Sequence, residues 1–174
     1  MMKEEHRQQV EEWTGMKCGD IVFDSNVDNW SRYTSVFNDR IIGKKQLTFL
    51  IEDDCGEIFG YYLNTEIVEK YKERQETDSK TFQFNLQSKN NRLKQPMKFE
   101  IKDLKSGSIL LSQKRICDLI SLGDIHLFKE VEKNQSYCWQ NEDYFDYHGI
   151  EKALCGTIYP KKFIPKRILV IQMK

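Results

Sequence analysis

The stretch QLTFLIEDDCGEIFGYYL, residues 46–63, decides the fold that this sequence predicts. Its first half alternates apolar and polar side chains, so that Leu47, Phe49 and Ile51 fall on one face of a β-strand. Its second half, EIFGYYL, is a returning strand, and Gly56 between the two halves can adopt the positive φ that a tight turn requires. These features predict a β-hairpin, the basic unit of an antiparallel sheet.

Further short stretches have the alternation or the apolar runs that are typical of strands, which gives about nine strands in all. Strands do not alternate regularly with helical segments, and this argues against a doubly wound parallel sheet. The sequence therefore predicts a mainly β fold with helices (α+β), in which two antiparallel sheets pack as a β-sandwich flanked by short helices. The further stretches are 20–25, 81–86, 97–103, 108–112, 116–122, 124–131 and 166–173.

The first residues are predicted to form a helix that precedes the sandwich. Residues 3–14 are rich in Glu, Arg and Gln, with Val10 and Trp13 on one face, and Gly15 would end the helix. A helix of this length is marginal alone, so we expect it to dock through its two apolar residues. We divide the chain into a helical leader, residues 1–14, and one domain, residues 15–174.

Three later segments are expected to interrupt the strands. The aromatic residues of 29–42 recur at helical intervals, which predicts a helix there. The polar segment 65–80 is expected to be a helix or an irregular excursion, and 144–156 a loop that leads into a short helix ending at Gly156.

The composition is that of a folded intracellular protein. The 174 residues are 39% hydrophobic and 12% aromatic, with no apolar run of the roughly 18 residues that a membrane helix needs. The polar start MMKEEHRQQVEEW does not resemble a signal peptide, so we expect a location in the cytoplasm or the nucleus and five reduced cysteines.

The stretch FDSNVDNW, residues 23–30, resembles the start of a calcium loop because oxygen-bearing side chains occupy alternate positions. However, Asn29 stands where the loop requires glycine, and Ser35 stands where it requires a bidentate carboxylate. We therefore expect no metal here. Ser25 and Asp28 are instead predicted to cap a helix that begins near Val27.

Charge is distributed unevenly along a chain whose net charge is 0. Residues 81–115 and 161–174 are basic, whereas 1–80 and 116–160 are acidic. If the two basic segments met in space they would form a surface for a polyanion such as the DNA backbone; otherwise they are solvated strand faces. The candidate polyanion-binding residues are Lys94, Lys98, Lys114, Arg115, Lys161, Lys162, Lys166 and Arg167.

The cysteines and histidines do not define a catalytic site by their spacing. Asp146 and His148 could join Cys138 or Cys155 in a nucleophilic set, but nothing in the spacing demands it. Cys117 is the candidate redox-sensitive thiol because the basic residues 114–115 precede it. Zinc spacing and glycine-rich phosphate loops are missing from the sequence, so we expect no cofactor.

The order of these elements resembles the TLDc domain family over residues 15–174. Residues 21–63 resemble the first half of that domain, and the segment Gly56–Tyr62, GEIFGYY, matches its pattern G-x-[VI]-F-G-x-[YF]. The strands 81–86 and 122–128, the loop 136–156 and the closing strand 163–173 are similar to later elements. The residues that carry the resemblance are Asp24, Ser25, Asp28, Trp30, Gly56, Phe59, Gly60, Asp124 and Gly156.

The resemblance implies a β-sandwich and a non-enzymatic protein-interaction domain linked to protection against oxidative stress. Several members of the family bind the vacuolar proton pump, so the resemblance also implies this pump as a partner. Two alternatives remain: a DNA-binding regulator of stress-response genes that uses the basic segments, and a small thiol-dependent enzyme.

Overall fold

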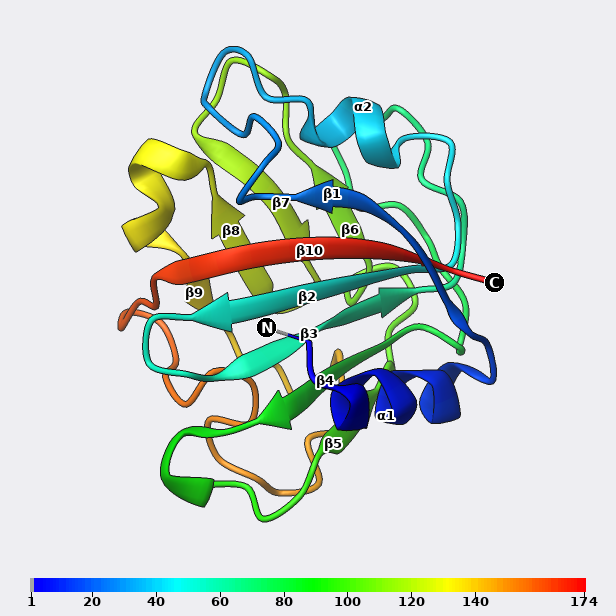
Figure 1. Ribbon diagram of the computed structural model, residues 1–174, viewed down its shortest axis with the longest axis vertical. Helices are drawn as coiled ribbons and strands as arrows, with labels where there is room; N and C mark the ends of the chain where they lie inside the picture. The colour runs from blue at the N-terminus through cyan, green and yellow to red at the C-terminus, as the bar shows by residue number, and fades with distance from the viewer. Residues whose placement is uncertain (1) are drawn as a thin grey trace.

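The computed structural model describes residues 2–174 and contains two antiparallel β-sheets that pack face to face (Figure 1). Together with a few short helices this confirms the predicted mainly β sandwich. The six-stranded sheet has the order β1 (Cys18–Asp24), β10 (Pro165–Met173), β2 (Leu47–Asp53), β3 (Ile58–Leu63), β4 (Phe82–Gln87), β5 (Met97–Glu100). The four-stranded sheet, behind it in Figure 1, has the order β6 (Ile109–Leu111), β7 (Asp118–Leu122), β8 (Ile125–Phe128), β9 (Tyr137–Cys138). The helices are α1 (Glu4–Thr14), α2 (Phe37–Ile41), and the 3-10 turns η1 (Lys89–Asn91) and η2 (Glu130–Gln135).

The predicted hairpin forms the middle of the six-stranded sheet. Strands β2 and β3 pair with Phe49 opposite Tyr61, and Gly56 in the turn has a φ of 90°. The closing strand β10 lies between β1 and β2 and pairs with both. Residues 2–174 contain ten strands rather than about nine, because the two-residue strand β9 was not predicted.

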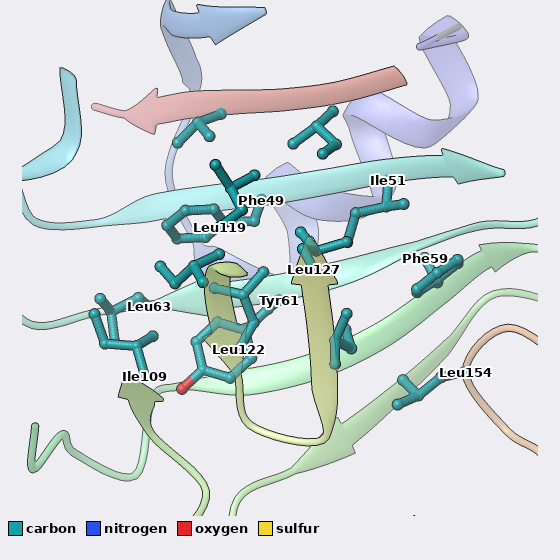
Figure 2. Packing of buried hydrophobic residues seen from close by; sticks show 14 of the residues in the cluster. Phe49, Ile51, Phe59, Tyr61, Leu63, Ile109, Leu119, Leu122, Leu127 and Leu154 are labelled. Atoms are coloured by element: carbon teal, nitrogen blue, oxygen red, sulfur yellow. The ribbon is translucent and has the colours of Figure 1, made fainter. Parts of the chain in front are cut away.

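The main core lies between the two sheets (Figure 2). Phe49 and Tyr61 of the hairpin face Leu122 and Leu127 of the four-stranded sheet, and all four side chains are at most 1% exposed. Alternate residues of each strand therefore point into this layer, as the period of two in the sequence requires.

A second apolar cluster lies on the outer face of the six-stranded sheet, under α1. Val10 is fully buried, and the ring of Trp13 lies 6.0 Å from that of Phe82 and 5.9 Å from that of Phe84. The helix ends at Gly15, which has a left-handed φ of 71°. The leader helix thus docks as expected. Among residues 2–174, none of the helices has the length and apolar character that crossing a membrane demands.

The helix expected over 29–42 is much shorter, because only α2 is helical. The side chain of Asn29 accepts a hydrogen bond from the backbone N–H of Ser31 at 2.9 Å, and such side chains compete with a helix for its first donors. The expectation that a helix begins near Val27 is also wrong. The N–H of Val27 donates to the carbonyl of Asp24 in an isolated turn.

The short helix expected before Gly156 is also missing. His148, Gly149 and Lys152 have φ values of 55°, 73° and 51°, which a right-handed helix cannot include. The segment 65–80 is an irregular excursion, the second of the two expected forms. Gln75 holds it together, since its side chain accepts from the N–H of Val68 at 2.9 Å and donates to the carbonyl of Val68 at 2.7 Å.

Candidate functional site

A group of exposed aromatic side chains lies beside the edge strand β9. Trp139 and Tyr159 are 42% and 44% exposed, and their ring centroids are 4.5 Å apart. Tyr137 lies 4.9 Å from Tyr159 and 5.9 Å from Trp139, and it stacks on His126 at 4.7 Å. We call Tyr137, Trp139 and Tyr159 the aromatic surface.

Local pairing explains why these rings come together. Tyr137 and Trp139 are two residues apart on the same side of the extended chain, whereas Cys138 between them is buried in the core. The loop that carries Tyr159 runs along β9, where the N–H of Tyr159 donates to the carbonyl of Cys138 at 2.9 Å. The aromatic surface therefore rests on a hydrogen-bonded edge, not on a free loop.

A pocket of about 550 Å³ opens next to Trp139. This volume lies within the range of about 300–1,000 Å³ that small-ligand sites usually have. The lining residues are Arg74, Asp124, His126, Trp139, Gln140, Asn141, Glu142 and Tyr144.

Arg74 reaches this pocket from the excursion 65–80. Its Nη1 donates to the carbonyl of Ser108, and its Nη2 donates to the carbonyl of Gly123 at 3.2 Å. No carboxylate of residues 2–174 lies within ion-pair distance of it. Burial lowers the pKa of Arg74 from its ordinary value. The guanidinium is fixed in place but still has N–H groups for a ligand.

Asp124 is the acidic counterpart of Arg74 and is 2% exposed. Its Oδ2 accepts hydrogen bonds from the hydroxyl of Tyr147 and, at 2.8 Å, from the N–H of Asn141. Burial raises the pKa of Asp124 above its ordinary value. The backbone N–H of Asp124 donates to Gln83, and its carbonyl accepts from the N–H of Trp139. Asp124, one of the residues that carry the family resemblance, thus holds the pocket-lining segment in place through hydrogen bonds.

His126 contributes a neutral ring to the pocket. Burial lowers the pKa of His126 to about 4, so it is uncharged at pH 7. Its Nδ1 lies 2.8 Å from the hydroxyl of Ser121, and the plane of its ring stacks on Tyr137.

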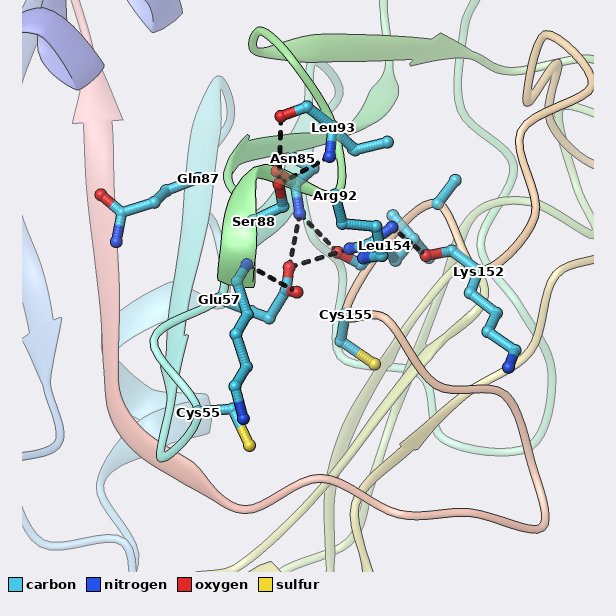
Figure 3. Close-up of polar contacts among 12 residues, drawn as sticks. Cys55, Glu57, Asn85, Gln87, Ser88, Arg92, Leu93, Lys152, Leu154 and Cys155 are labelled. Carbon is cyan, nitrogen blue, oxygen red and sulfur yellow. Dashed lines mark hydrogen bonds and ion pairs between the residues drawn. The ribbon is translucent and has the colours of Figure 1, made fainter.

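A second polar centre holds the loops at one end of the sheet together (Figure 3). Glu57 is 3% exposed, and Nη2 of Arg92 lies 2.9 Å from its Oε2. Asn85 donates to the same oxygen at 3.0 Å, and Arg92 also donates to the carbonyl of Lys152. Gly156 lies against this pair, since a Cβ there would be 3.1 Å from Glu57. The arrangement has a structural role, because each carboxylate oxygen of Glu57 already accepts a hydrogen bond from the protein.

The stretch with the calcium-like spacing joins β1 to β10. Arg167 donates to Oδ1 and Oδ2 of Asp24 at 3.0 and 2.7 Å, and this bidentate contact lowers the pKa of Asp24. Oδ2 of Asp28 accepts from the N–H of Asp24, and the hydroxyl of Ser25 accepts from the N–H of Ile168. The side chains of Asp24 and Ser25 therefore connect the end of β1 to β10 by hydrogen bonds. They do not cap a helix, contrary to the expectation from the sequence for Ser25 and Asp28. Of the other motif residues, Trp30 and Phe59 belong to the main core.

The eight candidate polyanion-binding residues come from separate strands and loops of the fold. Lys98 on β5 is separated from Lys166 and Arg167 on β10 by three strands, roughly 19 Å at the usual strand spacing. Lys166 and Arg167 also form ion pairs with Glu52 and Asp24. Lys94 lies before β5, Lys114 and Arg115 lie between β6 and β7, and Lys161 and Lys162 lie in the loop before β10.

The structure does not assemble the cysteine–histidine set. The side chain of His148 is 44% exposed and contacts Asp146 and the carbonyl of Lys98. Cys138 and Cys155 are 1% and 4% exposed, with Cys155 close to Thr157 rather than to a histidine. Cys117 is only half-buried and stays a candidate thiol.

Apart from Asp124, sequence reasoning missed the residues that form the pocket and the aromatic surface. The period-two spacing of Tyr137 and Trp139 in SYCWQ was a usable signal for a strand with an aromatic face. Nothing in the sequence connects Arg74 to residues 124–144, because an irregular segment brings it there. No family model matches this sequence, and a search of curated proteins finds no significant relative.

Proposed function

We propose that the chain is a non-enzymatic protein-interaction domain that contacts its partner through the aromatic surface. The observation that carries this proposal is the exposed Trp139–Tyr159 stack beside Arg74. Trp, Tyr and Arg are the residue types that dominate binding energy at protein interfaces. Rings held by neighbouring rings and a paired backbone lose little conformational freedom on binding, which favours affinity.

The chemistry of the pocket supports binding over catalysis. Its lining in the described chain includes neither Cys nor Ser, the usual nucleophiles. His126 has a pKa of about 4, too far below neutrality for an efficient general base at pH 7. Asp124 already accepts hydrogen bonds from Tyr147 and Asn141.

We extend the proposal to the role that the TLDc resemblance implies, protection against oxidative stress through a protein partner, with the vacuolar proton pump as the candidate. The support is the agreement of architecture, a sandwich of two antiparallel sheets with short helices. The alternative role as a DNA-binding regulator has less support, because the basic residues are dispersed and two of them pair with acids.

The test is a quantitative pull-down with the full chain as bait, at low and at moderate salt. Proteins captured by the wild type should fall at least tenfold with Tyr159→Ala or Trp139→Ala. Tyr33→Ala is the matched control, because Tyr33 is a 66% exposed aromatic residue in another part of the fold. The variant Tyr33→Ala should capture the same proteins as the wild type, and subunits of the proton pump should be among them.

Two outcomes would contradict the proposal. A partner that all three variants retain equally would place the binding surface elsewhere. A specific partner that is captured without any pump subunit would leave the aromatic surface intact as a binding site and remove the pump from the proposal.

A further inference from the structure

The pocket beside Trp139 is a concave feature that a flat protein contact does not require. We propose that it binds a neutral saccharide, which stacks its apolar ring face on Trp139 and places its hydroxyl groups between Arg74 and Asp124. This inference goes beyond the proposed protein interaction, because it assigns a small-ligand site to the pocket itself.

The polar groups around the pocket offer both donors and acceptors. Arg74 has N–H groups beyond the two that bind carbonyls, and the Nδ2 amide of Asn141 has no partner among residues 2–174. Oδ1 of Asp124 accepts no hydrogen bond within the described chain, and the acidic residue Glu142 also lines the pocket. A ligand that fits must both donate and accept at several neighbouring points, as the vicinal hydroxyl groups of a sugar do.

The charge balance disfavours the other ligand classes. An anion would meet the single guanidinium of Arg74, but it would also face the carboxylates of Asp124 and Glu142. An apolar ligand would remove water from Arg74 and Asp124 without replacing their hydrogen bonds, which is costly. A neutral polyhydroxylated ligand avoids both penalties.

The pocket wall is already organised for such a ligand. Arg74 is tied to two carbonyls, and the side chain of Asp124 is held by Tyr147 and Asn141. The backbone N–H of Trp139 donates to the carbonyl of Asp124 at 2.8 Å, which fixes the backbone that carries the ring. Little side-chain freedom therefore remains to be lost on binding.

The test is an isothermal titration of the full chain with glucose, galactose, mannose, N-acetylglucosamine, cellotriose and maltotriose, with acetate and inorganic phosphate as the anion arm. We expect saturable binding of at least one saccharide. Trp139→Ala should weaken this binding at least tenfold, whereas Tyr33→Ala should leave it within twofold of the wild type. No binding of any saccharide, or binding of acetate or phosphate alone, would overturn the inference.

Asn141→Asp separates this site from the protein contact. Aspartate keeps the Oδ1 atom that accepts the N–H of Asp143 at 3.0 Å, but it removes the amide donor of a residue that lines the pocket. We expect Asn141→Asp to weaken saccharide binding at least threefold and to leave capture of the protein partner unchanged. Saccharide binding that Asn141→Asp and Trp139→Ala leave unchanged would place the sugar elsewhere, whatever the result of the pull-down.

Discussion

Phe84 lies directly against Gly60 on the neighbouring strand. A Cβ atom at position 60 would be 2.8 Å from the Phe84 ring and 1.9 Å from the carbonyl oxygen of Phe49. The ring of Trp13 in α1 lies 5.9 Å from the same Phe84 ring. The glycine therefore makes room for an aromatic stack that connects the leader helix to the outer face of the sheet.

Gly60→Ala is expected to destabilise the fold, because the added methyl group meets backbone atoms that cannot rotate away. Overpacking of this kind costs about 1–3 kcal/mol, and occasionally more. Urea denaturation followed by circular dichroism would measure the loss. Gly43→Ala is the control, since Gly43 has a φ of 82° but nothing within 4 Å of a Cβ, and should show only backbone strain of about 1 kcal/mol. Equal losses for the two variants would show that crowding is not the cause.

Particular elements show how far the sequence predicts this fold. The hairpin 46–63 and the closing strand were predictable, because the alternation of residues 47–51 and the apolar run of the closing strand are both typical of strands with buried side chains. Residues 29–42 have helical spacing, but side-chain hydrogen bonds such as that of Asn29 compete with the helix. The short helix expected before Gly156 does not form, because His148 and Lys152 have positive φ values. The outcome there depends on tertiary contacts that a single sequence does not reveal.

The candidate site was harder to predict than the fold. Asp124 was singled out as a motif residue, and it does line the pocket. Arg74, however, comes from an irregular segment whose path is set by contacts such as the hydrogen bond to the carbonyl of Gly123. Lys98 and Lys166 represent the two basic segments of the sequence, and they lie on strands that the sheet order separates.

Arg92→Met should destabilise the protein much more than loss of an exposed ion pair. It leaves Glu57, which is 3% exposed, without its positive partner. Breaking a buried pair costs about 3–5 kcal/mol, and we expect about 2–4 kcal/mol here because Arg92 is partly exposed. Lys70→Met is the control, since the Lys70–Glu73 pair is 47% and 50% exposed and should be worth about 0–1 kcal/mol.

The double variant Glu57→Gln with Arg92→Met tests the cause of that loss. Removing the carboxylate charge together with its partner should restore part of the stability that Arg92→Met alone removes. If the double variant is as unstable as the sum of both single variants, the charge of Glu57 is not the reason for the effect.

Asp53→Asn should change how stability depends on pH. Burial raises the pKa of Asp53 to about 6, whereas an unfolded chain has a value near 3.9. The folded state thus binds more protons between these values. The resulting stabilisation is fully present below about pH 4 and is lost as the pH rises through about 6. Its size is at most about 3 kcal/mol.

The measurement is the free energy of unfolding of wild type and variant between about pH 4 and pH 7. Asparagine can still accept the N–H groups of Cys55 and Glu57, so Asp53→Asn should remain folded. The difference in the free energy of unfolding between wild type and variant should change with pH below about pH 6 and level off above it. Asp54→Asn in the same turn is the exposed control and should follow the wild type. A variant that keeps the full wild-type slope would assign the titration to another group, such as Asp124.

Binding to duplex DNA should be weak and should depend only shallowly on salt, because few phosphates are contacted. Tight binding requires several basic side chains close together, and the sheet order keeps β5 and β10 apart. Arg167 is also held by Asp24, so it would have to leave a bidentate ion pair to reach a phosphate. Fluorescence anisotropy at about 50 and 200 mM salt should give a log–log slope of about −0.9 per phosphate contacted, with few contacts and no preference for sequence. Tight, sequence-dependent binding at the higher salt, abolished by Lys161→Glu with Lys162→Glu, would instead favour the DNA-binding regulator.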